Sequence, residues 1–465
     1  MLPPFDPWLS AVAAADVSAS TYLAPQRLAE LRARRLAALV ASAARNSPLY
    51  RRVLRAADPE RLRLDQLPVV SKAELMRDFD LWVTDPEIRL DELQRFTADR
   101  SRIAEPYLGR YTVWESSGTG GGALGIFVQD AAAMAVYDAL EAVRHPPLHP
   151  SRRLLDPYFL SERIAFVGAT SGHFASTVSV ERLRRLNPLL APRLHSVSFL
   201  QPLAGLRDEL RVLRPTIVAT YPSVAVLLAQ EQTAGRLNIA PAEIWTGGET
   251  LTAAMRGYVE QAFGCSVANS YGASEFLALA SQCRFGALHL NSDWAILESV
   301  DAAGKPVPPG HAGTSVLLTN LANRVQPIIR YDLADSVTLH PAGCPCGSSL
   351  PVIDVQGRRD DTLLLPGTAG GTVSILPLAV STVLEDEAGL FDFQLVQRGP
   401  RDLLLRTGMR ADSQQALLGR ARAVLAGYLE RQGVAGVRID CRAGEFPQPG
   451  RAAKTRRVVA LARPG

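Results

Sequence analysis

The stretch TVWESSGTGGGALGIFVQD, residues 112–130, places two serines, one threonine and four glycines in the seven positions 116–122, between two apolar runs. Glycines let backbone N–H groups converge on an anion, and hydroxyls add donors, so the pattern indicates a phosphate-binding loop within a β-hairpin. A flexible hairpin turn without a ligand is the alternative. No Lys-Ser/Thr pair follows the glycines, which excludes a Walker A loop. A strand-like run follows instead of a helix, which argues against a dinucleotide-binding fingerprint.

Around this loop the sequence alternates between short apolar runs and helical patterns. Residues 26–46 carry Leu and Ala at helical spacing, Ser71 is a helix cap, and 181–186 and 223–234 are further helical segments between strands. This alternation predicts α/β layers. A compositional break at GRRDD, residues 357–361, precedes three strand-like runs around one helix near 412–431. We therefore predict a large layered N-terminal domain, 1–358, and a small α+β C-terminal domain, 359–465.

Composition excludes several classes of protein. The chain has 465 residues, of which 47% are hydrophobic and 21% charged, which is ordinary for a globular protein. Its net charge of +4 (50 − 46) is too small to indicate nucleic-acid binding. No apolar run reaches the length of a membrane span, and MLPPFDPWLS lacks the features of a signal peptide. We expect a cytoplasmic protein without membrane association.

The five cysteines suggest metal binding more than disulfides, because an odd number in a reducing compartment argues against pairing. Cys344 and Cys346 lie in CPCG, and CRFGALH contains Cys283 and His289. Three thiolates and one imidazole suit tetrahedral Zn²⁺. A reduced surface loop, with Cys283 as a small buried hydrophobe, is the alternative. Cys265 and Cys441 are expected to be packing residues.

Eight short motifs occur in one order along nearly the whole chain: SSGTGGG (116–122), YPS (221–223), WTGGE (245–249), SYGASE (270–275), QPIIRYDLAD (326–335), CPCG (344–347), GRRDD (357–361) and GRAAKTRRVV (450–459). Each motif is weak alone. In this order they resemble the adenylate-forming superfamily, in its phenylacetate–CoA ligase branch. The resemblance implies a large adenylation domain with a small mobile C-terminal domain. It also implies activation of a carboxylic acid by ATP as an acyl-adenylate, and some members of the branch have a similar structural zinc site.

The resemblance assigns the nucleotide-binding residues. Ser117, Thr119 and Gly120 would hold the ATP phosphates, and Glu275 with Thr119 would bind Mg²⁺, a hard cation that prefers oxygen ligands. The loop departs from the family, because Gly122 stands where many members have Lys. The remaining positions would contact adenine or ribose: Gly247, Gly248, Glu249, Tyr271, Gly272, Ser274, Asp335 and Arg358.

Four further residues carry expectations about chemistry or domain movement. Lys454 matches the catalytic lysine that stabilises charge at the α-phosphate, against a solvated basic tail as the alternative. Asp360 matches the hinge about which the small domain turns. His173 would line the acyl pocket and contact the substrate carboxylate, although a core histidine is the alternative. Arg330 stays open between a phosphate contact and a structural role.

The function implied is an ATP-dependent, AMP-forming acid–thiol ligase that acts on an aryl or other small organic acid. The thiol would be CoA or the phosphopantetheine of a carrier protein. Transfer to an amine and a non-catalytic nucleotide-binding descendant, which the missing loop lysine suggests, are the alternatives. A homodimer is a further expectation, since dimers are common in this branch.

Overall fold

The computed structural model describes residues 2–54, 63–116, 124–144, 154–156, 159–170, 172–199, 201–341, 343–358, 361–368, 370–375, 377–408, 415–444 and 457–461. Within them the chain folds into α/β layers, which confirms the predicted class. None of the helices in these ranges has the length and apolar character that a membrane span requires.

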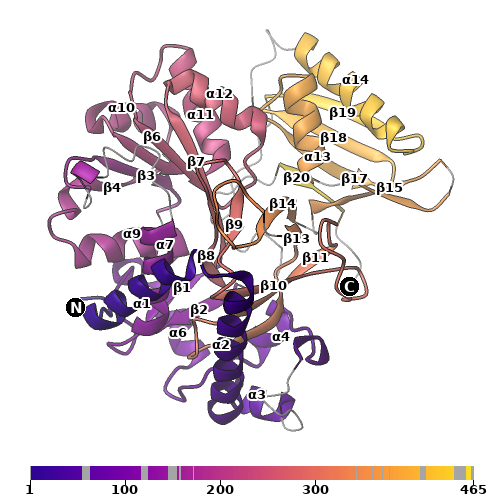
Figure 1. The fold of residues 1–465 in the computed structure, drawn as a ribbon. Helices are drawn as coiled ribbons and strands as arrows, with labels where there is room; N and C mark the ends of the chain where they lie inside the picture. Colours follow the sequence, from indigo (N-terminus) through magenta and orange to yellow (C-terminus); the bar gives the residue numbers. More distant parts are fainter. Residues whose placement is uncertain are drawn as a thin grey trace.

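A nine-stranded mixed sheet forms the centre of the molecule (Figure 1). Its order is β13-β14-β9-β8-β7-β6-β5-β3-β4, with parallel pairing from β4 to β7 and antiparallel pairing from β7 to β13. The strands are β3 (Ile164–Gly168), β4 (Leu194–Ser198), β5 (Ile217–Thr220), β6 (Glu243–Gly247), β7 (Ser266–Ala273), β8 (Phe276–Gln282), β9 (Leu288–Leu290), β13 (Asp335–His340) and β14 (Val352–Arg358).

Helices cover the parallel half of this sheet. They are α9 (Ala175–Leu186), α10 (Leu203–Leu213), α11 (Pro222–Thr233) and α12 (Ala253–Phe263). Residues of α10, α11 and α12 form one apolar core with β5 and β6, which is why these strands read as continuous hydrophobic runs. The two helices predicted near 181–186 and 223–234 are therefore confirmed, as α9 and α11.

The N-terminal helices pack against the antiparallel half. They are α1 (Pro7–Ser20), α2 (Pro25–Asn46), α3 (Pro48–Val53), α4 (Lys72–Arg77), α5 (Phe79–Trp82), α6 (Leu90–Ala98) and α7 (Ala131–Arg144). The periodicity of 26–46 is confirmed by α2, which buries Leu28, Leu39, Val40 and Ala43. Ser71 caps α4 through a capping box with Glu74, also as predicted.

A buried ion pair ties α7 to the loop after β9. Arg144 donates to both carboxylate oxygens of Asp293, at 2.7 and 2.9 Å, and the two side chains are 4% and 0% exposed. Ser20 of α1 and Arg35 of α2 also donate to Asp293. Burial alone would raise the pKa of Asp293, but its hydrogen bond and charge pairing with Arg144 hold that pKa below the usual range.

The predicted strands of the middle region are confirmed in two smaller sheets. β1 (Thr112–Glu115) and β2 (Ile126–Gln129) form the antiparallel hairpin expected around the glycine loop. β10 (Ala295–Val300), β11 (Ser315–Asn320) and β12 (Ile328–Asp332) form a three-stranded antiparallel sheet.

Residues after 360 have a separate apolar core. A four-stranded sheet, β19-β18-β17-β20, packs with α14 (Gln415–Arg431), beside the pair β15 (Leu363–Pro366) and β16 (Thr372–Ile375). The remaining elements are α13 (Pro377–Thr382), η5 (Val383–Glu387), β17 (Gln394–Gly399), β18 (Asp402–Thr407), β19 (Arg438–Ala443) and β20 (Val458–Val459). Figure 1 shows this group, in orange and yellow, beside α12. The strands and helix expected here are confirmed, while the domain boundary at 358/359 stays a prediction.

Candidate active site

The turn between β7 and β8 carries a buried carboxylate. Glu275 is 8% exposed, and the hydroxyl of Tyr331 in β12 donates to its Oε1 at 2.6 Å. Burial raises the pKa of Glu275, while the Tyr331 hydrogen bond and the charge of Lys72 oppose that rise and the charge of Asp335 adds to it. A carboxylate that is oriented, buried and close to a second carboxylate suits a divalent cation, because the cation would stabilise its ionised form.

A second hydrogen bond joins two of the motifs identified in the sequence. The hydroxyl of Tyr271 in β7 donates to Oδ2 of Asp335, the first residue of β13, at 2.7 Å. The register of β13 against β14 then places Asp335 opposite Arg358. Asp335 and Arg358, the two residues predicted to contact ribose, therefore lie at the same end of the β13–β14 pair. Tyr271, the residue predicted to contact adenine, adjoins Asp335 there.

Two glycines lie where strands approach each other closely at this site. A Cβ on Gly272 would lie 1.8 Å from the carbonyl oxygen of Leu277, so only glycine fits between β7 and β8 there. A Cβ on Gly247 would lie 2.8 Å from Oγ of Ser270. The adjacent Gly248 has φ +77°, in the left-handed region that favours glycine.

Glu249 links the WTGGE and YPS motifs. Its Oε2 accepts a hydrogen bond from the backbone N–H of Ser223 at 3.1 Å. Its Oε1 is buried without a hydrogen-bond partner among the described residues. A polar group attached to a ligand would satisfy that oxygen, which agrees with the predicted position of Glu249 beside the nucleotide.

Buried amides hold the glycine hairpin against the same site. Gln326 accepts from Val128 N at 2.8 Å and donates to Ile126 O at 3.0 Å, while Asn323 donates to Val128 O at 2.8 Å. Trp114 of β1 donates to the carbonyl of Ser274 at 2.7 Å, which ties the hairpin to the SYGASE turn. The base of the hairpin is therefore fixed beside Glu275.

Several predicted residues lie outside the described part of the chain. They are Ser117, Thr119 and Gly120 of the loop, Gly122 where the family has Lys, the hinge residue Asp360, and Lys454. Their roles stay predictions.

Arg330 has a structural role among the described residues. Its guanidinium donates to Glu298 at 3.1 Å and to the carbonyl of Leu67, and the side chain is 5% exposed. Of the two alternatives for this residue, the structure favours packing and pairing over a phosphate contact. Its φ of +51° distorts β12 next to Tyr331.

His173 is buried next to α6. It is 0% exposed, its ring centroid lies 5.5 Å from that of Phe96, and burial lowers its pKa. Neither ring nitrogen has a hydrogen bond of normal geometry within the described residues. This environment favours a neutral packing residue, so the catalytic role expected for His173 stays a prediction without support from its contacts.

The four predicted metal ligands come together at the end of the central sheet. Their ligand atoms lie within 4.8 Å of one another, as expected from the sequence. Cys283 follows β8 and His289 lies in β9, while Cys344 and Cys346 lie between β13 and β14. Because β9 pairs with β14 and places His289 opposite Val352, the sheet brings these distant segments into contact.

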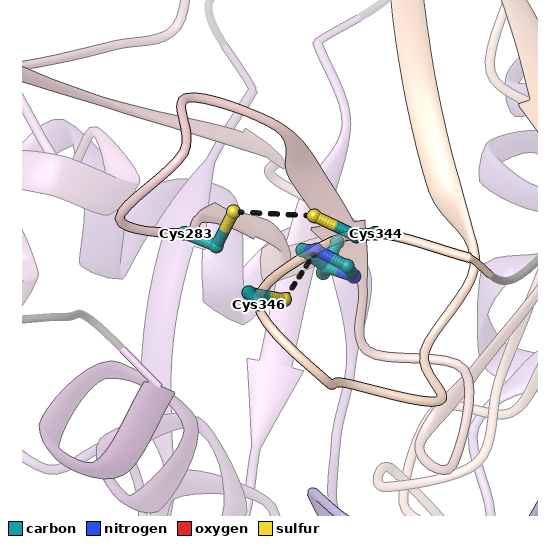
Figure 2. Close-up of side chains that lie close together, drawn as sticks. Cys283, Cys344 and Cys346 are labelled. Atoms are coloured by element: carbon teal, nitrogen blue, oxygen red, sulfur yellow. Dashed lines mark hydrogen bonds between the residues drawn. The ribbon is translucent and has the colours of Figure 1, made fainter.

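Two distances within this cluster can be compared with those of a tetrahedral zinc site. Sγ of Cys283 lies 3.7 Å from Sγ of Cys344, and Sγ of Cys346 lies 3.3 Å from Nε2 of His289. Bonds of about 2.3 Å to sulfur in a tetrahedron place two sulfurs about 3.8 Å apart. Figure 2 shows the thiols of Cys283 and Cys344 facing each other, with Cys346 on the neighbouring turn.

A second contact orients the imidazole. Nδ1 of His289 lies 2.8 Å from the carbonyl oxygen of Leu350, so Nδ1 carries the proton and Nε2 is left for a metal. The N–H of Ser348 donates to Sγ of Cys346 at 3.4 Å.

Tyr331 is a site residue that the sequence analysis missed. It lies in QPIIRYDLAD, one of the quoted motifs, between Arg330 and Asp335. Alternation along a strand places neighbouring residues on opposite faces, so Tyr331 and Arg330 could have been assigned to different surroundings. No pattern in the sequence indicated that its hydroxyl reaches a glutamate 56 residues away.

Sequence comparisons with known proteins give one short match. No protein-family model matches the chain. Protein CapK of Staphylococcus aureus is 30% identical over 103 residues, which is 22% of this chain and 21% of CapK. The chain thus matches about a fifth of the length of that relative.

Solved structures match over most of the chain. A 2-hydroxyisobutyryl-CoA ligase in the postadenylation state, in complex with R3-HIB-AMP, has a TM-score of 0.68 and 20% identity, with 95% of this chain and 91% of the ligase covered. The amide bond synthetase McbA from Marinactinospora thermotolerans has a TM-score of 0.50 and 15% identity, with coverages of 74% and 67%. The chain therefore has the fold of an AMP-forming CoA ligase, as its motifs predicted.

Proposed function

We propose that this protein activates a small carboxylic acid with ATP, forming an acyl-adenylate and pyrophosphate, and then transfers the acyl group to a thiol. The observation that carries the proposal is the junction of Tyr271 with Asp335 and of Tyr331 with Glu275. These two hydrogen bonds join two separate motifs, SYGASE and QPIIRYDLAD, at one place on a CoA-ligase fold. The finer assignment to phenylacetate–CoA ligases rests on the motifs alone.

Each gathered residue has a chemical task in this reaction. Asp335 accepts hydrogen bonds from the ribose hydroxyls, and Tyr271, which orients it, stacks near adenine. Glu275 supplies oxygen ligands for Mg²⁺, which when bound would neutralise phosphate charge. Thr119 would add a hydroxyl ligand, and Lys454 would stabilise charge at the α-phosphate during attack by the carboxylate.

The arrangement of the chain is more similar to the postadenylation state of one solved ligase than to its thioesterification state. One 2-hydroxyisobutyryl-CoA ligase matches with TM-scores of 0.68 and 0.67 in its postadenylation state, but 0.56 in its thioesterification state, at the same 95% coverage of this chain. Because the ligase is the same protein, the difference comes from the placement of its parts. This chain would need a rearrangement before thiol attack.

CoA is the acceptor that the comparisons favour, because that ligase is solved with an acyl-adenylate and CoA together. A carrier-protein phosphopantetheine shares the reactive thiol, and an amine acceptor would give an amide. Supplying the activated acid with each acceptor in turn distinguishes the three.

One structural zinc ion is part of the proposal. Cys283, His289, Cys344 and Cys346 would hold it with four protein ligands, so no coordination position is left for a substrate. Its removal should lower stability more than it changes chemistry.

Calorimetric titration with ATP and Mg²⁺ tests nucleotide binding. A variant with both Thr119→Ala and Asp335→Ala should bind ATP much more weakly than the wild type. Asp208→Ala is a matched control, because the Asp208 side chain is 72% exposed and forms a surface ion pair with Arg211. Equal affinity for ATP in the wild type, the double variant and Asp208→Ala would contradict the proposed nucleotide site.

The role of Lys454 is tested by separating the half-reactions. Lys454→Ala should slow adenylation by roughly 10²–10³-fold, the scale for losing one preorganised charge-stabilising group. It should slow thiol transfer from supplied acyl-adenylate much less. Lys305→Ala changes an exposed lysine and is the control. Unimpaired ATP–pyrophosphate exchange in Lys454→Ala would remove the assignment.

A further inference from the structure

The sequence of the glycine loop lacks the lysine that would neutralise phosphate charge, and the structure attaches another lysine to the strand that contacts Glu275. The chain has only three lysines: Lys72, Lys305 and Lys454. Lys305 is exposed in the turn after β10, whereas Lys72 is the first residue of α4 and is half-buried. Lys72 is therefore the lysine whose surroundings need an explanation.

A backbone bridge fixes where Lys72 lies. Val70 pairs with Tyr331 in a parallel bridge, in which Val70 N–H donates to Arg330 O at 3.1 Å and Asp332 N–H donates to Val70 O at 3.0 Å. Two residues later α4 begins, and its Ser71–Glu74 capping box sets the direction of the first turn. Lys72 is thereby attached to the strand whose Tyr331 hydroxyl holds Glu275.

The ammonium of Lys72 differs from most buried cations of the described chain in its lack of a described partner. It forms no ion pair or hydrogen bond with a residue in the ranges that the structure describes. Its charge nevertheless lies close enough to Glu275 to lower the pKa of that buried carboxyl group. Most other cations that enter the described core are paired, as Arg144 is with Asp293 and Arg330 with Glu298.

We propose that Lys72 is a catalytic residue that binds the β- or γ-phosphate of ATP, in place of the lysine missing at Gly122 of the loop. The inference rests on the proposed function, because it needs ATP beside Glu275. An ammonium is a compact point charge with three donors, which suits phosphate oxygens. The pyrophosphate that leaves on adenylation carries the charge that Lys72 would stabilise.

If Lys72 contacts the β- or γ-phosphate, its loss should weaken the binding of ATP more than the binding of AMP. Losing a charge-assisted hydrogen bond to phosphate should weaken ATP binding about 10- to 100-fold. AMP lacks the β- and γ-phosphates, so its affinity should change less than about twofold. A merely structural lysine would affect both nucleotides alike.

The test compares Lys72→Gln with Lys305→Gln, a matched change at an exposed lysine. Calorimetry with ATP, AMP and pyrophosphate is followed by ATP–pyrophosphate exchange, with KM for ATP and kcat measured separately. We expect weaker binding of ATP and pyrophosphate, normal AMP binding and a raised KM for ATP in Lys72→Gln only. ATP binding equal to the wild type, or equal loss of ATP and AMP binding, would overturn the proposal.

A second readout does not depend on activity. With three lysines in the chain, acetylation by an amine-reactive reagent can be followed at each residue by mass spectrometry. ATP should protect Lys72 while AMP should not, and Lys305 should react equally in all samples. Modification of Lys72 that ATP does not slow would contradict the proposal, whereas a wild type that binds no ATP would contradict the proposed function itself.

Discussion

Replacing Tyr331 by phenylalanine tests how a single hydroxyl affects the pKa of Glu275. The change removes only the hydroxyl that donates to Glu275 at 2.6 Å, from a side chain that is 3% exposed. Burial already raises the pKa of Glu275, and this hydrogen bond is the largest effect opposing that rise. A hydrogen bond to a charged group contributes about 1.5–3 kcal/mol, which corresponds to about 1–2 pKa units.

The direction of the pH effects follows from that shift. A raised carboxyl pKa means that the folded state favours the protonated form, so its contribution to stability is complete at low pH and is lost as pH rises through the folded-state pKa. Tyr331→Phe should therefore destabilise the fold more at pH 8 than at pH 5. Because Mg²⁺ binding needs the ionised carboxylate, the acid limb of adenylation activity should move upward by about 1–2 pH units.

The assay is ATP–pyrophosphate exchange measured from pH 5 to pH 9, together with urea unfolding at both ends of that range. Tyr22→Phe removes a hydroxyl from a side chain that is 71% exposed and serves as the control. An acid limb that coincides with that of the wild type, at reduced or normal activity, would refute the reasoning. A uniform loss of stability at all pH values would show that Tyr331 acts only by packing.

Three further changes test other parts of the structure. Cys344→Ser should abolish stoichiometric zinc and lower the unfolding temperature, whereas Cys441→Ser should retain the metal; zinc content equal to the wild type in Cys344→Ser would remove the site. Asp293→Asn should lower the free energy of unfolding by about 3–5 kcal/mol at pH 7, because it leaves Arg144 buried without its charge partner. The difference from the wild type should shrink in acid, as Asp293 of the wild type becomes protonated through its lowered pKa. A loss below about 1 kcal/mol in denaturant unfolding at pH 7 would contradict this prediction. Glu385 accepts hydrogen bonds from Arg457 and from Thr252, the N-cap of α12, and should hold the C-terminal region on that helix. Glu385→Gln should therefore speed hydrogen exchange over residues 252–263 about tenfold. Glu387→Gln, which changes an exposed ion pair with Arg431, is the control and should leave that exchange rate unchanged. Equal exchange in the two variants would show that Glu385 does not hold that contact.

Local patterns in the sequence predicted individual elements well. The period of 26–46 predicted α2, and the glycines between two apolar runs predicted the β1–β2 hairpin. These predictions succeed because helix and strand periodicity, caps and turn residues act over a few neighbouring residues. The cluster of Cys283, His289, Cys344 and Cys346 was also predictable, because only a few residue types ligate zinc.

Contacts made by side chains across the sheet were not predictable in the same way. Arg330 could not be assigned from sequence, since its partners Glu298 and Leu67 lie on other elements. His173 looked chemically useful in its motif, but its burial against Phe96 depends on how α6 packs. Tyr331 and Lys72 were missed because their importance comes from the Val70 bridge and from Glu275, which tertiary structure alone brings together.

The most direct test of the central claim follows an oxygen atom from the acid to AMP. Attack of a carboxylate on the α-phosphate forms a bond between its own oxygen and phosphorus, and thiol attack at the carbonyl carbon then leaves that oxygen on AMP. With substrate acid labelled by oxygen-18 in the carboxylate, the account predicts AMP that carries one labelled oxygen for each thioester formed. AMP without label, or label recovered in inorganic phosphate instead, would contradict an acyl-adenylate mechanism.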